Sequence, residues 1–158
     1  MEQNRSTNMT HPEELNADGF RHKIPLQLRF NDVDVLGHVN NTVYFSFYDT
    51  GKAHYFNSVL KEKMDWQNVD TVIAHINCSY LSPIVFGENI EVRTRCTAIG
   101  EKSLHLEQIL VESDTNEIKS VCRTVMVGYN PATKRSEAID ERKKRLFCEY
   151  ENKNLIEK

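Results

Sequence analysis

The sequence contains no long apolar segment, and this absence limits the class of protein. No stretch approaches the ~18 consecutive apolar residues of a membrane-spanning helix. Residues 1–20 are polar and lack the apolar core of a signal peptide. We therefore expect a cytoplasmic protein with no membrane partner.

An excess of either charge is also missing. Twenty Lys and Arg stand against 23 Asp and Glu, which gives a net charge of -3. Non-specific binding to nucleic acid depends on a strong basic excess, so no nucleic-acid partner is expected. A small anionic ligand held by two or three local cations is still compatible with this balance.

Closely spaced metal ligands and the common nucleotide motifs are absent as well. The sequence has no C-x-x-C and no H-E-x-x-H, so we expect reduced thiols and no metal site. Without G-x-G-x-x-G or G-x-x-x-x-G-K, a nucleotide-phosphate cradle is unsupported, and no G-x-S-x-G supports a Ser-His-Asp triad. The four cysteines are Cys78, Cys96, Cys122 and Cys148.

The sequence does contain a change of hydrophobic period near residue 40. Apolar residues alternate over 24–30, which predicts a strand. From residue 43 they recur at helical spacing, which predicts a long helix capped by Asn40 or Asn41. The stripe comprises Val43, Tyr44, Phe47, Tyr48, Gly51 and Tyr55.

Four strand-like segments follow the helix, over residues 70–81, 90–99, 103–112 and 117–130, and the charged segment after Pro131 predicts a short helix or tail. This order predicts an α+β fold in which an antiparallel five-stranded sheet wraps around one long central helix. We expect a flexible tail or a loosely docked segment at 1–20, a single domain at 21–150 and a C-terminal tail at 151–158.

The densest polar cluster, residues 31–41, lies where the first strand meets the helix. A carboxylate beside the free N–H groups of a helix N-terminus suits hydrolysis, because one group activates an oxygen and the other binds an oxyanion. Gly37 permits a tight turn there. An Asx-type turn with a helix cap would explain Asp32, Asn40 and Asn41 without chemistry, so the residues alone leave both interpretations open.

Residues 29–55 closely resemble the signature of the hotdog-fold thioesterases of the 4-hydroxybenzoyl-CoA thioesterase-like family. The resemblance covers roughly residues 22–130 and implies a hotdog fold that hydrolyses acyl-CoA or acyl-carrier-protein thioesters. It also implies a homodimer or homotetramer, and no cofactor besides the CoA of the substrate. The family pattern D-x-D-x-x-G-H-V-N-N-x-x-Y is matched without a gap by Asp32, Asp34, Gly37, His38, Val39, Asn40, Asn41 and Tyr44.

The resemblance also implies roles for these residues. Asp34 would be the catalytic carboxylate, as general base or nucleophile, and the backbone N–H of Asn41 the oxyanion donor. His38 would orient Asp34 or contact the substrate, unless it is only a satisfied polar group. Asp32 would chiefly order the loop, and Tyr44 would either line the acyl pocket or pack in the core. The predicted substrate-binding residues are Asp32, Gly37, Asn40, Tyr44, Arg93 and Lys102.

The cations that would bind the CoA phosphates are less well defined. Arg93, Arg95 and Lys102 near the 100–102 turn and the run Arg142–Arg145 are candidates, with a solvated surface as the alternative. Two rival functions remain, namely a non-catalytic acyl-thioester binding module and a hotdog dehydratase acting on 2-enoyl or 3-hydroxyacyl thioesters. The D-x-D-x-x-G-H-V-N-N string does not resemble the dehydratase motif. Because open sheet edges invite pairing, we also expect edge-to-edge dimers.

Overall fold

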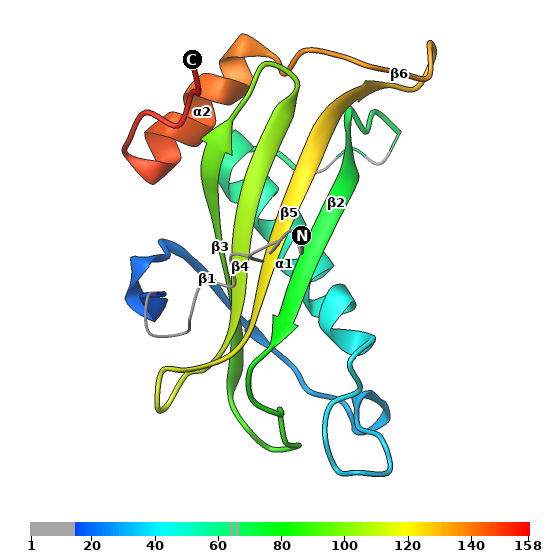
Figure 1. The fold of residues 1–158 in the computed structure, drawn as a ribbon, viewed down its shortest axis with the longest axis vertical. Coiled ribbons are helices and arrows are strands. Elements are labelled where there is room, and N and C mark those ends of the chain that lie inside the picture. The colour runs from blue at the N-terminus through cyan, green and yellow to red at the C-terminus, as the bar shows by residue number, and fades with distance from the viewer. Residues whose placement is uncertain (1–14, 64, 66) are drawn as a thin grey trace, which may run out of the picture.

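A computed structural model describes residues 15–63, 65 and 67–158 of the chain. One antiparallel sheet, in the spatial order β1-β3-β4-β5-β2, curls around the long helix α1 (Figure 1). The predicted α+β architecture is confirmed. No helix in the described ranges is long and apolar enough to cross a membrane. The elements are β1 (His22–Leu26), α1 (Val43–Leu60), β2 (Thr71–Tyr80), β3 (Ile90–Ile99), β4 (Ser103–Glu112), β5 (Glu117–Asn130), β6 (Arg135–Ser136) and α2 (Glu141–Glu151).

The curl of the sheet follows from its register. β1 pairs with β3 and β2 pairs with β5, so β1 and β2 form the two edges. The register shifts between Ile73 and His75 in β2 and between Cys96 and Ala98 in β3. Because bulges of this kind increase the local twist, the sheet bends around α1 and does not lie flat.

The buried stripe of α1 packs on the concave face of the sheet. Tyr48 is fully buried, and its hydroxyl donates to Ser120 Oγ on β5 at 2.7 Å. Gln108 Nε2 on β4 donates to the Tyr48 carbonyl at 2.9 Å. Most of the predicted stripe is buried. The buried residues of α1 are Tyr44, Phe47, Tyr48, Gly51, Lys52, Tyr55 and Val59.

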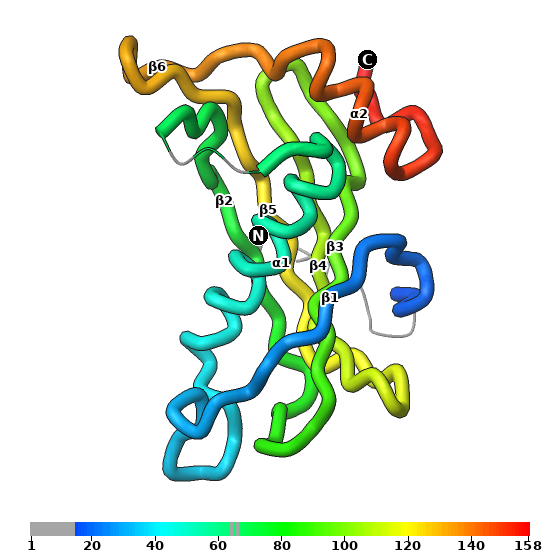
Figure 2. The backbone as a smooth tube through the Cα atoms, turned by 180° about the vertical axis from the view of Figure 1, so that it is seen from behind, coloured from blue at the N-terminus to red at the C-terminus, as the bar shows by residue number. Residues whose placement is uncertain are grey.

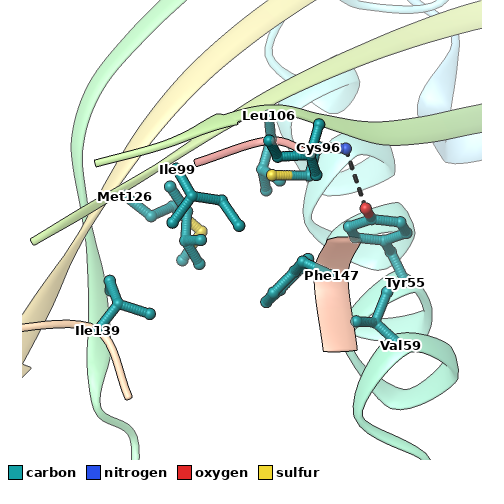
Figure 3. Packing of buried hydrophobic residues seen from close by; sticks show 10 residues of the cluster. Tyr55, Val59, Cys96, Ile99, Leu106, Met126, Ile139 and Phe147 are labelled. Carbon is teal, nitrogen blue, oxygen red and sulfur yellow. Dashed lines mark hydrogen bonds between the residues drawn. The ribbon is translucent and has the colours of Figure 1, made fainter. Parts of the chain in front are cut away.

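A second cluster joins the C-terminal half of α1 to α2 and β3 (Figure 3). The Tyr55 hydroxyl accepts the Cys96 backbone N–H at 2.9 Å and donates to Glu151 Oε1 at 2.6 Å. Phe147 of α2 packs against the Tyr55 ring, with 5.9 Å between the ring centroids. Tyr55 therefore connects both helices to the sheet. This contact lies at the end of the molecule remote from the 31–41 loop, as the view from behind in Figure 2 shows.

Two element boundaries differ from the sequence prediction. β1 ends at Leu26, because residues Phe30–Asp32 form a short 3-10 helix held by the Asp32 carboxylate on the Arg29 N–H. α1 begins at Val43, since Asn40 and Thr42 close a turn before it. The N-cap, Thr42, makes no side-chain capping bond, so the predicted cap at Asn40 or Asn41 is wrong.

Both expected tails contain residues that pack on the domain. Phe20 lies on the convex face of the sheet in a cluster with Leu15, Ala17, Ile109 and Val121. At the other end, the Ile99 N–H donates to the Leu155 carbonyl at 2.8 Å, and Leu155 is buried. Residues 15–20 are therefore docked on the sheet and Leu155 is held to β3, while residues 1–14 lie outside the described residues.

The Gly51→Ala variant should be less stable than the wild type by about 1–3 kcal/mol, the usual cost of overpacking. A Cβ at this position would lie 2.7 Å from Val92 Cγ2 and 2.8 Å from Gln108 Nε2. In an open helix the same change stabilises by about 1 kcal/mol, so the sign of the effect tests the packing. Urea denaturation measures it, with the exposed neighbour Thr50→Ala as the matched control. A Gly51→Ala protein more stable than the wild type would contradict the close contact.

Candidate functional site

The polar loop folds into a small hairpin before α1. Val33 bridges to Val39, the Asp34 N–H donates to the His38 carbonyl at 3.0 Å, and the Gly37 N–H donates to the Asp34 carbonyl at 3.0 Å. Gly37 has φ +77°, the left-handed region that favours glycine. The motif therefore sets Asp34 and His38 side by side at the neck of the hairpin.

Asp32 holds this hairpin to the preceding chain. Its carboxylate is buried, and Oδ2 accepts the Arg29 N–H at 2.7 Å. Its carbonyl accepts the Asn40 N–H at 2.8 Å. The ion pair with the Arg29 guanidinium contributes little, because that side chain is 75% exposed and solvent screens the charge. These bonds agree with the predicted loop-ordering role of Asp32.

Asp34 is only partly buried, and its carboxylate has one engaged oxygen. Oδ1 accepts the Leu36 N–H at 2.9 Å, which makes Asp34 the Asx-turn residue of the loop. Oδ2 accepts no hydrogen bond from the described residues. One oxygen thus fixes the orientation of the carboxylate, and the other is free to act on a ligand.

The turn into α1 presents a free main-chain donor. Asn40 Oδ1 accepts the Thr42 N–H at 3.0 Å and the Thr42 hydroxyl at 2.8 Å. The Asn41 carbonyl accepts the Tyr80 hydroxyl at 3.1 Å, whereas the Asn41 N–H has no acceptor within the part of the chain described. This N–H precedes the N-cap Thr42 and is not used by the helix, so it can donate to an anion.

The loop between β2 and β3 forms the adjoining wall. The Val39 N–H donates to the Ile84 carbonyl at 2.8 Å, and His38 bridges to Val85. The buried Lys119 holds this wall through Glu88 Oε1 at 3.0 Å and the Pro83 carbonyl at 3.2 Å.

Lys119 remains a cation despite its burial. Burial by itself lowers the pKa of an ammonium, but the hydrogen bonds to Glu88 and Glu117 outweigh it, and the pKa of Lys119 is raised. The sequence offered no signal for this lysine, because its partners lie far from the motif in the chain.

Two tyrosines lie beneath the helix start. The rings of Tyr44 and Tyr80 meet edge to face, with 4.9 Å between their centroids. Tyr44 is 3% exposed, and burial raises the pKa of its hydroxyl. Tyr44 therefore packs in the core under the loop, and Tyr80, which no motif indicated, connects β2 to Asn41.

The structure does not bring the predicted cations to the loop. Arg93 is 4% exposed, and its guanidinium donates to the Ala17 carbonyl and to Asn116 Oδ1. Lys102 lies in the turn between β3 and β4, at the far end of the sheet near α2 (Figure 2). An exposed cation that does adjoin the loop is Arg29, which directly precedes the motif and was overlooked.

Several of the other candidate cations pair with carboxylates of the protein. Arg95 pairs with Glu107 on the convex face of the sheet. In the basic run on α2, Lys143 pairs with Asp70 and Lys144 with Glu141. Among the residues that the structure describes, no group of three or more His, Cys, Asp or Glu side chains could hold a metal ion.

Comparisons with known proteins identify the architecture. The chain is 27% identical to a thioesterase from Thermus thermophilus complexed with coenzyme A and zinc, with a TM-score of 0.77 over 86% of this chain and 98% of that one. It is 26% identical to the PA5185 protein from Pseudomonas aeruginosa strain PAO1, with a TM-score of 0.74 over 84% and 93%.

Among curated proteins, the uncharacterized protein YsmA of Bacillus subtilis (strain 168) is 27% identical over 84 residues, which are 53% of this chain. The match spans 56% of that relative, so it reaches only about half of its length. A family model covers far more, because residues 28–147 match the thioesterase-like superfamily. That range includes the hairpin, α1 and strands β2 to β5, and the chain therefore belongs to the thioesterase-like superfamily.

Proposed function

We propose that the protein hydrolyses an acyl-CoA thioester to a carboxylic acid and free CoA. The observation that carries this proposal is the Asp34 carboxylate, held by one oxygen and open at the other, in the hairpin that leads to the free N–H of Asn41. Membership of the thioesterase-like superfamily supports thioester hydrolysis as the reaction class. The coenzyme A bound to the T. thermophilus thioesterase supports CoA as the carrier, with acyl-carrier protein as the alternative.

The reaction needs one activated oxygen and a place for a tetrahedral anion. Asp34 either attacks the thioester carbonyl, giving a mixed anhydride that water hydrolyses, or removes a proton from an attacking water. The carbonyl oxygen becomes an oxyanion next to the Asn41 N–H, a contact worth about 2.7–4 kcal/mol in comparable sites. The C–S bond then breaks, and CoA leaves as a thiolate that takes up a proton. His38, whose backbone pairs with Asp34 in the hairpin, orients Asp34 or contacts the substrate.

The phosphates of CoA need a cation at the same end of the sheet. Arg29 is mostly exposed there, and an arginine fork matches phosphate oxygens geometrically. We assign it this role in place of Arg93 and Lys102. Gly37 and Asn40 shape the loop, and Tyr44 supports it from below.

The substrate site is completed by a second copy of the chain. Exposed apolar side chains follow the edge strand β2 and continue around the loop, and a patch of this kind marks a contact surface. In our proposal two β2 edges pair to form one continuous sheet, as a dimer that can assemble further into a tetramer. The exposed apolar residues are Phe30, Val35, Leu36, Val72, Ile73, Tyr80, Leu81, Val85 and Phe86.

Asp34→Asn should lower kcat by 10² or more, because positioned acid–base groups contribute ~10²–10⁴-fold. KM should change less, since acyl burial and the CoA contacts lie elsewhere. Thiol release from a panel of acyl-CoA esters, read with a chromogenic thiol reagent, measures both constants. Asp32→Asn is the matched control and should retain more activity.

Four outcomes would contradict this assignment. If Asp34→Asn were active and Asp32→Asn inactive, Asp32 and not Asp34 would be the catalytic carboxylate. Full activity in both variants would show that the loop takes no part in catalysis. Wild-type protein that binds acyl-CoA but releases no thiol would be a binding module. Hydration of a 2-enoyl thioester without thiol release would indicate the dehydratase.

Asp32→Ala should lower the free energy of unfolding by about 1–3 kcal/mol, because the Arg29 N–H loses its charged acceptor. Urea denaturation monitored by circular dichroism gives this value. The exposed neighbour Asn31→Ala should be nearly neutral. Equal stability of the two variants would show that Asp32 does not hold the hairpin.

Ile73→Lys should convert the dimer to a monomer, because it places a charge on the exposed edge of β2, where Ile73 is 43% exposed. Light scattering at micromolar concentration detects the change. Ile156→Lys is the matched control, since Ile156 is 44% exposed but lies beside Ile99 near α2. A monomeric wild type, or a dimer that survives Ile73→Lys unchanged, would contradict pairing through β2.

A further inference from the structure

Two thiols face each other under α1. Cys78 on β2 and Cys122 on β5 are opposite partners in the antiparallel ladder, and both belong to the cluster that packs against Tyr44 and Tyr48. Opposite residues in such a ladder have Cα atoms ~4.5 or ~5.5 Å apart, depending on the type of pair. Disulfides span Cα separations of ~4.4–6.8 Å, so either type of pair permits a bond.

The two thiols also differ in chemical character. Cys122 donates a hydrogen bond to the Cys78 sulfur, and this bond lowers the pKa of Cys78, with further help from Ser120 and Tyr80. The Ser120 hydroxyl lies 3.6 Å from Cys78 Sγ. The same bond and burial raise the pKa of Cys122. The partial exposure of Cys78 on the edge strand, together with its lowered pKa, makes it the more accessible and more nucleophilic thiol of the pair.

The two thiols also differ in their exposure to solvent. Cys78 is half-buried on the edge strand, whereas Cys122 is fully buried. The remaining thiols have other surroundings. Cys96 is buried against the Ala98 carbonyl, with its pKa raised to about 12 by burial, and Cys148 accepts the Leu155 N–H.

We propose that Cys78 and Cys122 form a dithiol that hydrogen peroxide oxidises to an intramolecular disulfide. The Cys78 thiolate attacks a peroxide oxygen, the O–O bond breaks, and the leaving hydroxide takes up a proton, which gives a sulfenic acid and water. The Cys122 thiol then attacks the sulfenic sulfur, the S–S bond forms, and the S–O bond breaks. The hydroxyl leaves with the Cys122 proton as a second water, so two electrons pass from the thiols to one peroxide.

This bond would tie the edge strand to its neighbour close to the substrate site. Tyr80, whose hydroxyl contacts Asn41, lies two residues beyond Cys78 on the same face of β2. The disulfide closes a long loop of chain and should raise the melting temperature of the oxidised protein over the reduced one. The modification does not depend on the reaction proposed above, because it is read from mass and melting temperature.

The experiment treats the full chain with hydrogen peroxide, blocks the remaining thiols with iodoacetamide and measures intact and peptide masses. Lys and Arg residues place the four cysteines in four different tryptic peptides. The expected product is lighter by two hydrogen atoms, takes up label at Cys96 and Cys148 only, and links peptides 64–93 and 120–123. A thiol reductant should restore all four labels.

Cys78→Ser and Cys122→Ser should abolish the link, and Cys148→Ser should retain it. Sulfinic acid at Cys78 without a link, or a link between Cys96 and Cys148, would overturn the proposal. If Cys122→Ser fails to fold, the wild-type peptide map and the half-buried Cys78→Ser variant still decide the question.

Discussion

The close approach of α1 to the sheet at Gly51 determines where the rest of the molecule lies. Because Val92 and Gln108 occupy the space that a Cβ would need, the helix axis sits near the sheet along this stretch. The Tyr48 hydroxyl then reaches Ser120, and Tyr55 reaches both Cys96 and Glu151. With both halves of the helix held, the position of its N-terminus is fixed relative to the sheet.

Two carboxylates of one motif take different roles because their surroundings differ. Asp32 is buried and accepts the Arg29 main-chain N–H at 2.7 Å, so its carboxylate stabilises the backbone of the turn. Asp34, two residues later, uses one oxygen for the turn and leaves the other open. A buried carboxylate with its acceptor sites filled has no oxygen for a substrate, whereas a half-exposed one does. This contrast distinguishes the two carboxylates independently of the family pattern.

Local patterns predicted much of this fold, and long-range contacts account for the errors. Strands β3, β4 and β5 have the bounds that alternation and turn residues indicate, and the motif located the hairpin. Arg93 alternates with apolar residues and resembles a solvated side chain, yet residues 15–20 cover it from outside. Lys119 and Glu88 are 31 positions apart in the chain, and a periodic pattern in the sequence cannot predict such a pair. The unpredicted contacts are therefore those between segments distant in the chain.

The tip of the hairpin is unusually apolar for an exposed turn. Turn tips usually carry polar residues, since they face water. Here Val35 and Leu36 occupy the tip with relative exposures of 102% and 74%, and Phe30 beside them is 85% exposed. Burying a side chain of this kind is worth about 1.5–3 kcal/mol each, so the three together favour a covered state strongly. Lys119 and Glu88 hold the β2–β3 loop on one side of the hairpin. The apolar side chains of the hairpin tip are exposed on the other side. The hairpin tip and the edge strand β2 thus both expose apolar side chains, among them Val35, Leu36 and Ile73.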